Sequence, residues 1–212
     1  MEKIKMDAIL VHGMGRTPLA LSLLAARLRA AGIRPHFFGY SVTLERWGNC
    51  VNRYERFINR RVKGKQYIII GHSMGTVLTR AVLPRLIHQP TACFLLTPPT
   101  QACKAARYFA PKRLVKLLGG EMAQLLADPT FMESIPVPSV PTKIYAGTAG
   151  PRGRRSPFGN EPNDSVLMVK ETMLPGVPHQ TFPVLHTFIM NSTAITQDIL
   201  RTVKQYSSGD IR

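Results

Sequence analysis

The chain has 212 residues, of which 44% are hydrophobic and 19% are charged. This length and composition fit a single folded domain with a sizeable core, and they exclude wholesale disorder. The 28 lysines and arginines against 12 acidic residues give a formal net charge of +16, a balance that attracts polyanions such as anionic lipid headgroups. No nucleic-acid-binding motif accompanies the charge, so no specific nucleic acid is expected as a partner.

The predicted elements alternate between short apolar runs and helical patterns. Met6–Val11 predicts a buried strand, and Thr17-Pro18 then predicts the start of a helix that ends near Gly32. Further strands are predicted at 35–40, 66–70, 92–96, 142–146 and 181–185, and further helices at 44–62, 76–87 and 188–203. The alternation predicts an α/β fold with a mostly parallel central sheet and helices on both faces.

Residues 101–131 interrupt this alternation with a basic, helical pattern. We expect them to form a small helical cap inserted into a single domain that spans 1–212. Basic residues cluster within the cap and in the Gly- and Pro-rich loop 147–163, at Lys104, Arg107, Lys112, Arg113, Lys116, Arg152, Arg154 and Arg155. These clusters predict either an anion site or an ordinary solvated surface.

Cysteine usage and apolar runs bear on the compartment. Cys50, Cys93 and Cys103 show no metal-ligand spacing and cannot all be paired, which favours a reducing compartment. The apolar run Ala8–Val11 is too short for a signal-peptide core, and no run approaches the roughly 20 residues of a membrane span. We therefore expect a cytoplasmic protein that can associate with a membrane surface, with no metal or organic cofactor.

The most informative stretch is Gln66–Gly75, in which the strand Tyr67-Ile68-Ile69-Ile70 runs into Gly71-His72-Ser73-Met74-Gly75 and then into a helical pattern. Strand, G-x-S-x-G and helix in this order are typical of a nucleophilic serine held in a strained turn. Gly71 and Gly75 omit side chains where helix and strand approach closely. The alternative is a plain turn serine, with His72 serving for packing.

A serine nucleophile in this turn needs an acid and then a histidine later in the chain. His186 follows the predicted strand 181–185, which places its ring at the same sheet edge as Ser73, whereas the competing His179 precedes that strand. Asp164 lies in the loop after strand 142–146, with Glu161 as the near alternative. Asp164 can instead be an N-cap or turn residue, and His186 can instead be a structural histidine at a strand end.

The loop His12-Gly13-Met14-Gly15, after the first strand, supplies the third element. A tetrahedral acyl intermediate needs two N–H donors for its negative oxygen, and we expect them from the backbones of Met74 and Met14. This role needs only the backbone of the His12-Gly13 turn, so the His12 side chain is as easily explained by stabilising its own loop.

These motifs together resemble the α/β-hydrolase superfamily, and more narrowly small bacterial lipase/esterase-like hydrolases of the class 2 lipase and PGAP1-like groups. The resemblance covers most of the chain, through V-H-G-M-G at Val11–Gly15, G-H-S-M-G at Gly71–Gly75, P-N-D-S-V at Pro162–Val166 and L-H-T-F-I-M at Leu185–Met190. It implies Ser73 as nucleophile, Asp164 as acid, His186 as base, and Met14 and Met74 as oxyanion donors. A small-molecule or lipid ester is the implied substrate, and thioesterase or acyltransferase chemistry uses the same groups.

The sequence departs from the relatives' pattern at two points. Relatives often have glycine after the acid, where this chain has Ser165, and their P-P-N-Q-G segment reads Pro98-Pro99-Thr100-Gln101-Ala102 here. The alternative from another functional class is a non-catalytic scaffold of the same fold that binds anionic membranes or other polyanions through its basic surface.

Overall fold

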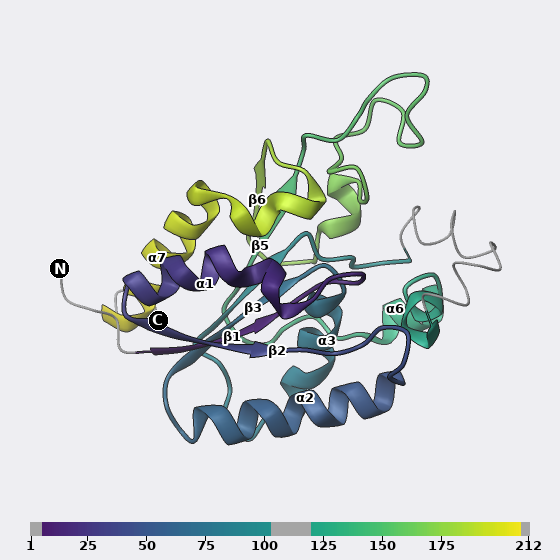
Figure 1. Cartoon of the computed structure of the whole chain (residues 1–212). Helices are drawn as coiled ribbons and strands as arrows, with labels where there is room; N and C mark the ends of the chain where they lie inside the picture. The colour runs from purple at the N-terminus through teal and green to yellow at the C-terminus, as the bar shows by residue number, and fades with distance from the viewer. Residues whose placement is uncertain (1–5, 103–119, 209–212) are drawn as a thin grey trace.

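The central element is one parallel sheet, seen in a computed structural model that describes residues 6–102 and 120–208. The six strands lie in the order β2-β1-β3-β4-β5-β6, and every neighbouring pair is parallel (Figure 1). The strands are β1 (Met6–Val11), β2 (Ile33–Phe38), β3 (Tyr67–His72), β4 (Ala92–Leu96), β5 (Thr142–Gly147) and β6 (His179–Phe182). The predicted α/β fold with a parallel sheet is confirmed.

Helices cover both faces of this sheet, as predicted. α1 (Ser22–Ala30) and α7 (Thr193–Ser208) lie on one face, and α2 (Trp47–Val62) and α3 (Met74–Val82) lie on the other (Figure 1). The remaining helical elements are η1 (Pro18–Leu21), η2 (Leu83–Arg85), α6 (Pro129–Ser134), η3 (Val169–Thr172) and η4 (His186–Asn191). Among the described residues, no helix combines the length and the apolar character needed to cross a membrane.

Two apolar layers hold the sheet between its helices, because each strand sends alternate side chains to opposite faces. In β3, Ile68 and Ile70 pack in the layer that contains α1 and α7, while Ile69 packs in the layer that contains α2 and α3. All three side chains are fully buried, and burying one of this size contributes roughly 1.5–3 kcal/mol. A continuous apolar run therefore fixes the central strand that leads into Ser73.

The predicted element boundaries shift where local hydrogen bonds intervene. β6 ends at Phe182 rather than Leu185, and the predicted helix 188–203 is divided into η4 and α7. Ser192 causes the division because its backbone is extended (φ −64°, ψ 123°) and its Oγ accepts a hydrogen bond from the N–H of Ile195 at 3.3 Å. This is the geometry of a new N-cap, so a second helix begins there.

Most of the predicted cap, including Lys104, Arg107, Lys112, Arg113 and Lys116, lies outside the described residues. The described end of the cap is helical at 120–125, and a short turn then leads to α6. This end contacts the start of α2: Glu121 accepts a hydrogen bond from the N–H of Trp47 at 2.8 Å, and the rings of Trp47 and Phe131 meet edge to face at 5.1 Å. The division into one domain with a cap stays a prediction.

Candidate active site

Ser73 occupies the turn between β3 and α3, in a backbone conformation that residues other than glycine rarely adopt. Its φ is 51° and its ψ is −122°, and its N–H donates to the carbonyl of Leu96 at the end of β4 over 2.9 Å. Such a conformation costs on the order of 1–3 kcal/mol and persists only where the surroundings impose it. The strained turn expected from the G-x-S-x-G spacing is therefore present, with Ser73 partly exposed.

Two glycines allow α3 to approach the ends of β1 and β3 this closely. A Cβ atom on Gly75 would lie 2.6 Å from the carbonyl oxygens of Val11 and His12, and one on Gly71 would lie 3.1 Å from the backbone of Gly75 and Thr76. Contacts with backbone atoms at these distances cannot be relieved by rotating a side chain. The sequence-based explanation for both glycines is confirmed.

Asp164 and His186 meet in a buried pair. The Nδ1 atom of His186 lies 2.7 Å from Oδ2 of Asp164, and the two residues are 7% and 1% exposed. The other carboxylate oxygen, Oδ1, accepts the backbone N–H groups of Val166 at 2.9 Å and Leu167 at 2.7 Å. The backbone N–H of His186 in turn donates to the carbonyl of Asp164 at 2.9 Å. Three hydrogen bonds thus fix the orientation of the carboxylate, and a fourth joins the backbones of the two residues.

The two competing residues have other partners. His179 begins β6, at the amino end of that strand, and its Nε2 lies 3.0 Å from the hydroxyl of Thr172. Glu161 forms an ion pair with Lys170 at 3.2 Å, and its side chain is 49% exposed. Neither side chain contacts His186 within the described residues, so the geometry favours Asp164 and His186 as the pair.

His72 links the strained turn Gly71–Gly75, here called the elbow, to the loop that carries His186. Its Nε2 lies 3.0 Å from the backbone carbonyl of His186, and the two ring centroids are 5.1 Å apart. Burial, and secondarily the neighbouring His186, hold the pKa of His72 well below its ordinary value of 6.5, so the ring is neutral and donates through Nε2–H. The side chain expected to serve for packing therefore also makes a directed hydrogen bond.

The hydroxyl of Ser73 makes no hydrogen bond to His186 within the described residues. Unliganded sites commonly show such bonds as long or absent, and they tighten when a substrate binds. His186 is nonetheless adjacent to the elbow, because it is bonded to His72, the residue just before Ser73.

The loop after β1 lies against the elbow. A Cβ on Gly13 would be 2.8 Å from Cβ of Ser73 and 2.8 Å from Nδ1 of His72, so only glycine fits there without movement. The ring of His12 donates from Nδ1 to the carbonyl of Gly13 at 2.8 Å, and burial lowers the pKa of His12. Since the peptide is planar and trans, fixing that carbonyl directs the N–H of Met14 to the opposite side.

Two residues near this edge were not anticipated from the sequence. Tyr40 stacks on His12 with ring centroids 4.5 Å apart and donates its hydroxyl to the carbonyl of His12 at 2.9 Å. Thr97, which follows β4, has a φ of 44° and is fully buried. Positive φ in a β-branched residue is an outlier that is found mostly at functional sites. The sequence signal that could have drawn attention to Thr97 is its place between a predicted strand and the prolines Pro98 and Pro99.

The turn after Asp164 is also strained. Ser165 has a φ of 84°, and its N–H donates to Oδ1 of the buried Asn163 at 2.9 Å. The left-handed region that this residue occupies favours glycine. Serine at this position therefore adds backbone strain to the turn.

No group of three or more His, Cys, Asp or Glu side chains among residues 6–102 and 120–208 is arranged to hold a metal ion.

A parallel sheet whose central strand delivers a serine into a strained turn before a helix, with a histidine–carboxylate pair in loops after later strands, defines the α/β-hydrolase class of proteins. The chain belongs to the Alpha/beta hydrolase family, whose sequence profile matches residues 8–193. No curated protein matches the chain.

Solved structures of similar fold include several enzymes. A lipase from Bacillus licheniformis is 19% identical, with 92% of each chain covered and a TM-score of 0.68. A monoglyceride lipase from Saccharomyces cerevisiae is 14% identical over 97% of this chain and 87% of its own, with a TM-score of 0.65. A thioesterase domain from the curacin biosynthetic pathway is 16% identical over 93% and 91%, with a TM-score of 0.60. At these identities the likeness establishes the fold.

Replacing Ser165 by glycine should stabilise the protein. Glycine adopts a φ of 84° without strain, and after the entropy that glycine adds to the unfolded chain we expect a net gain of about 0.5–1 kcal/mol. Urea denaturation measures this gain. Ser139→Gly is the matched control, since Ser139 is exposed and has no positive φ, and it should lose stability. A loss in Ser165→Gly equal to that in the control contradicts the strain argument.

His72 should make stability fall as the solution is acidified below pH 6.5. The unfolded chain binds a proton to this ring near pH 6.5, whereas the folded chain binds it only at much lower pH, so the unfolded state gains protons first. His72→Gln removes this titration and keeps a donor, and it should reduce the slope of unfolding free energy against pH by up to about 1.4 kcal/mol per unit.

The measurement is urea denaturation at intervals between pH 8 and pH 5. His88→Gln is the control because His88 is exposed, and its slope should match that of the wild type. Equal slopes for the His72 variant and the wild type would show that the buried ring does not contribute.

Proposed function

We propose that the protein is a serine hydrolase that cleaves a carboxylic ester or a related acyl bond. Ser73 is the nucleophile, His186 the general base and Asp164 the carboxylate that orients the base. The observation that carries the proposal is the buried 2.7 Å contact between His186 and Asp164, on a loop hydrogen-bonded to the residue that precedes a strained serine. A purely structural role for this histidine would not explain why its loop is bonded to the residue before Ser73.

In the first step, Nε2 of His186 takes the proton from the hydroxyl of Ser73 as the oxygen attacks the acyl carbon. The C–O bond to the leaving alcohol then breaks, and His186 returns the proton to that oxygen. In the second step, His186 takes a proton from a water molecule as the water oxygen attacks the acyl carbon. The bond from that carbon to the serine oxygen then breaks, and His186 returns the proton to Ser73. Asp164 holds Nδ1 protonated throughout, so Nε2 is the nitrogen that faces the serine.

The negative oxygen of the tetrahedral intermediate is stabilised by the backbone N–H groups of Met14 and Met74. Met74 is the first residue of α3, where N–H groups have no partner within the helix and the positive end of the helix dipole lies. The hydrogen bond from His12 to the carbonyl of Gly13 supports the orientation of the Met14 N–H. Removing one such donor typically costs on the order of a hundred- to thousandfold in rate.

The substrate class is the less specific part of the proposal. The similar structures include lipases and a thioesterase domain, and an acyl-enzyme serves both kinds of bond. We favour an ester with an anionic group, because Arg152, Arg154 and Arg155 are exposed on the loop that leads to Asp164. That loop extends away from the body of the molecule after β5 (Figure 1).

A fluorophosphonate probe should label the wild-type protein, because it reacts only with an activated serine. Ser73→Ala should abolish labelling, while Ser139→Ala, a change at an exposed serine, should leave it unchanged. Gel fluorescence of the probe measures this, with circular dichroism to verify that each variant is folded. A folded wild-type protein that is not labelled would favour the non-catalytic scaffold.

Asp164→Asn should lower kcat on a short-chain p-nitrophenyl ester by about ten-thousandfold, because the amide holds the imidazole in the wrong tautomer. Glu161→Gln is the matched control: it removes the rival carboxylate, which pairs with Lys170 at the surface, and should leave kcat unchanged. Steady-state kinetics at pH 8 distinguish the two variants. The opposite ranking would transfer the role of the acid to Glu161.

A further inference from the structure

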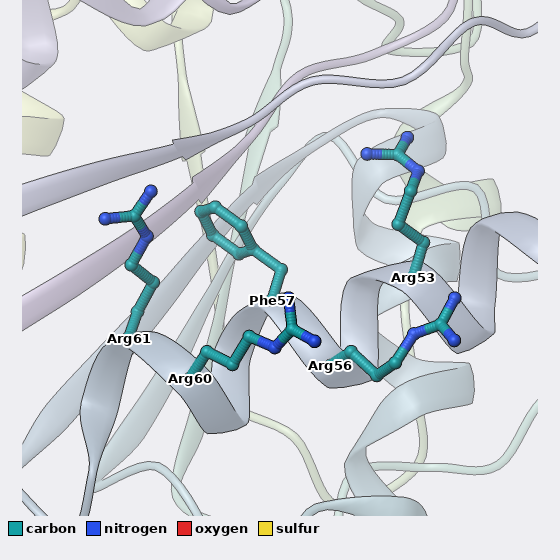
Figure 2. A pocket seen from close by; sticks show the side chains of 5 residues that line it. All are labelled: Arg53, Arg56, Phe57, Arg60 and Arg61. Carbon is teal, nitrogen blue, oxygen red and sulfur yellow. The ribbon is translucent and has the colours of Figure 1, made fainter.

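Helix α2 carries a depression of about 420 Å³ that is lined by four arginines and one phenylalanine. The lining residues are Arg53, Arg56, Phe57, Arg60 and Arg61 (Figure 2). Their spacing of three, four, seven and eight residues from Arg53 places them on neighbouring positions of one helix face. The depression is therefore a surface that the sequence of a single helix builds.

The arginines differ in how far their charge is already neutralised. Arg53 donates to both carboxylate oxygens of Glu45, at 2.8 and 2.7 Å, and to the carbonyl of Gly39 at 2.8 Å. Arg56, Arg60 and Arg61 form no ion pair among the described residues. The single acidic residue of α2, Glu55, pairs instead with Arg85 at 2.7 Å. Three guanidinium groups of the depression thus remain without a counter-charge.

Phe57 gives this cluster a fixed floor. It is half-buried, and its ring lies 5.4 Å from that of Phe38 in the edge strand β2. The guanidinium of Arg61 lies over the ring of Phe57 at 5.4 Å from its centroid. Stacking on an aromatic face restricts an otherwise flexible side chain, so at least this arginine is partly pre-organised for a ligand.

An ordinary solvated helix face would mix the two signs of charge. Like charges three or four residues apart, as between Arg53, Arg56 and Arg60, destabilise a helix by a few tenths of a kcal/mol per pair. Arginine rather than lysine is the residue whose planar fork binds carboxylate and phosphate oxygens in pairs. An anion with several oxygens would remove the repulsion and use the unpaired donors.

We propose that the α2 depression binds a phosphate-bearing ligand through Arg56, Arg60 and Arg61. A phosphomonoester or diphosphate group offers the charge and the several oxygens that three guanidinium groups can share. The volume of about 420 Å³ falls within the range of roughly 300–1,000 Å³ found for small-molecule sites. The phosphate can belong to a soluble compound or to the headgroup of an anionic lipid.

This site is separate from Ser73 and does not depend on the proposed hydrolase activity. α2 returns the chain from the carboxyl end of β2 to the amino end of β3, so its later turns lie toward the amino ends of the strands. Ser73 lies at the carboxyl end of β3. Hydrolysis of a neutral ester should therefore be unaffected by changes in the depression.

Calorimetric titration with sodium pyrophosphate at 150 mM salt tests the site. The triple variant R56Q/R60Q/R61Q should bind at least about tenfold more weakly than the wild type, because several charge-assisted hydrogen bonds are lost. The control R29Q/K170Q/R201Q removes the same number of charges from exposed positions on α1, η3 and α7, and should bind like the wild type. R56K/R60K/R61K keeps the charge without the planar fork and should bind more weakly. Circular dichroism and neutral-ester hydrolysis verify the fold of each variant.

Sedimentation with vesicles distinguishes the two sources of phosphate. Recruitment to phosphatidylcholine vesicles only when they contain phosphatidic acid, with competition by pyrophosphate, supports a lipid headgroup. Pyrophosphate binding without recruitment supports a soluble ligand. The proposal is overturned if the wild type binds neither probe, if the control R29Q/K170Q/R201Q weakens binding as much as the α2 variant, or if the lysine variant binds as tightly as the wild type.

Discussion

The close approach of α3 to the ends of β1 and β3 is the constraint on which the site depends. Gly71 and Gly75 permit it, and Ser73 adopts its strained conformation because strand and helix leave no other path between them. The strain of roughly 1–3 kcal/mol is small against the burial of β3, in which every residue is buried. The core therefore determines where the hydroxyl lies, and the parallel sheet determines what surrounds it, because all its loops after strands meet at one edge.

Backbone contacts then hold those loops in register. The carbonyl of His186 is bonded to His72 and its N–H to Asp164, so this one residue joins the elbow to the acid loop. Gly147, at the end of β5, allows the loops of Asp164 and His186 to approach each other. A Cβ at this position would lie 2.8 Å from Cβ of Asp164 and 2.3 Å from the carbonyl oxygen of Val184. Misplacing a catalytic group by about 1 Å can cost a hundredfold in rate. Rigidity at this edge is thus consistent with acyl chemistry.

The parallel sheet and the elbow could be predicted because their signals are local: apolar runs of strand length and glycines at fixed spacing around Ser73. Chain order indicated Asp164 and His186 as candidates but could not predict their contact. In a sequence, a loop carboxylate that caps a turn cannot be distinguished from one that orients a histidine ring. Tertiary partners left no signal at all. The contact of Tyr40 with His12 and the bond from His72 to the carbonyl of His186 join residues 28 and 114 positions apart. Local capping also explains the break at Ser192. The apolar pattern on the two sides of this residue is continuous, so the sequence predicts a single helix there.

The net charge of +16 acquires meaning only through its distribution. Some arginines are compensated by a neighbouring carboxylate, as Arg53 is by Glu45 and Arg85 by Glu55. On the later turns of α2 they are not, and the helix bears that repulsion next to a half-buried Phe57. The same crossover that carries these arginines leads into β3 and so to Ser73. The uncompensated charge and the proposed nucleophile thus lie at opposite ends of the sheet, so the anion and the acyl group of the two proposals would not compete.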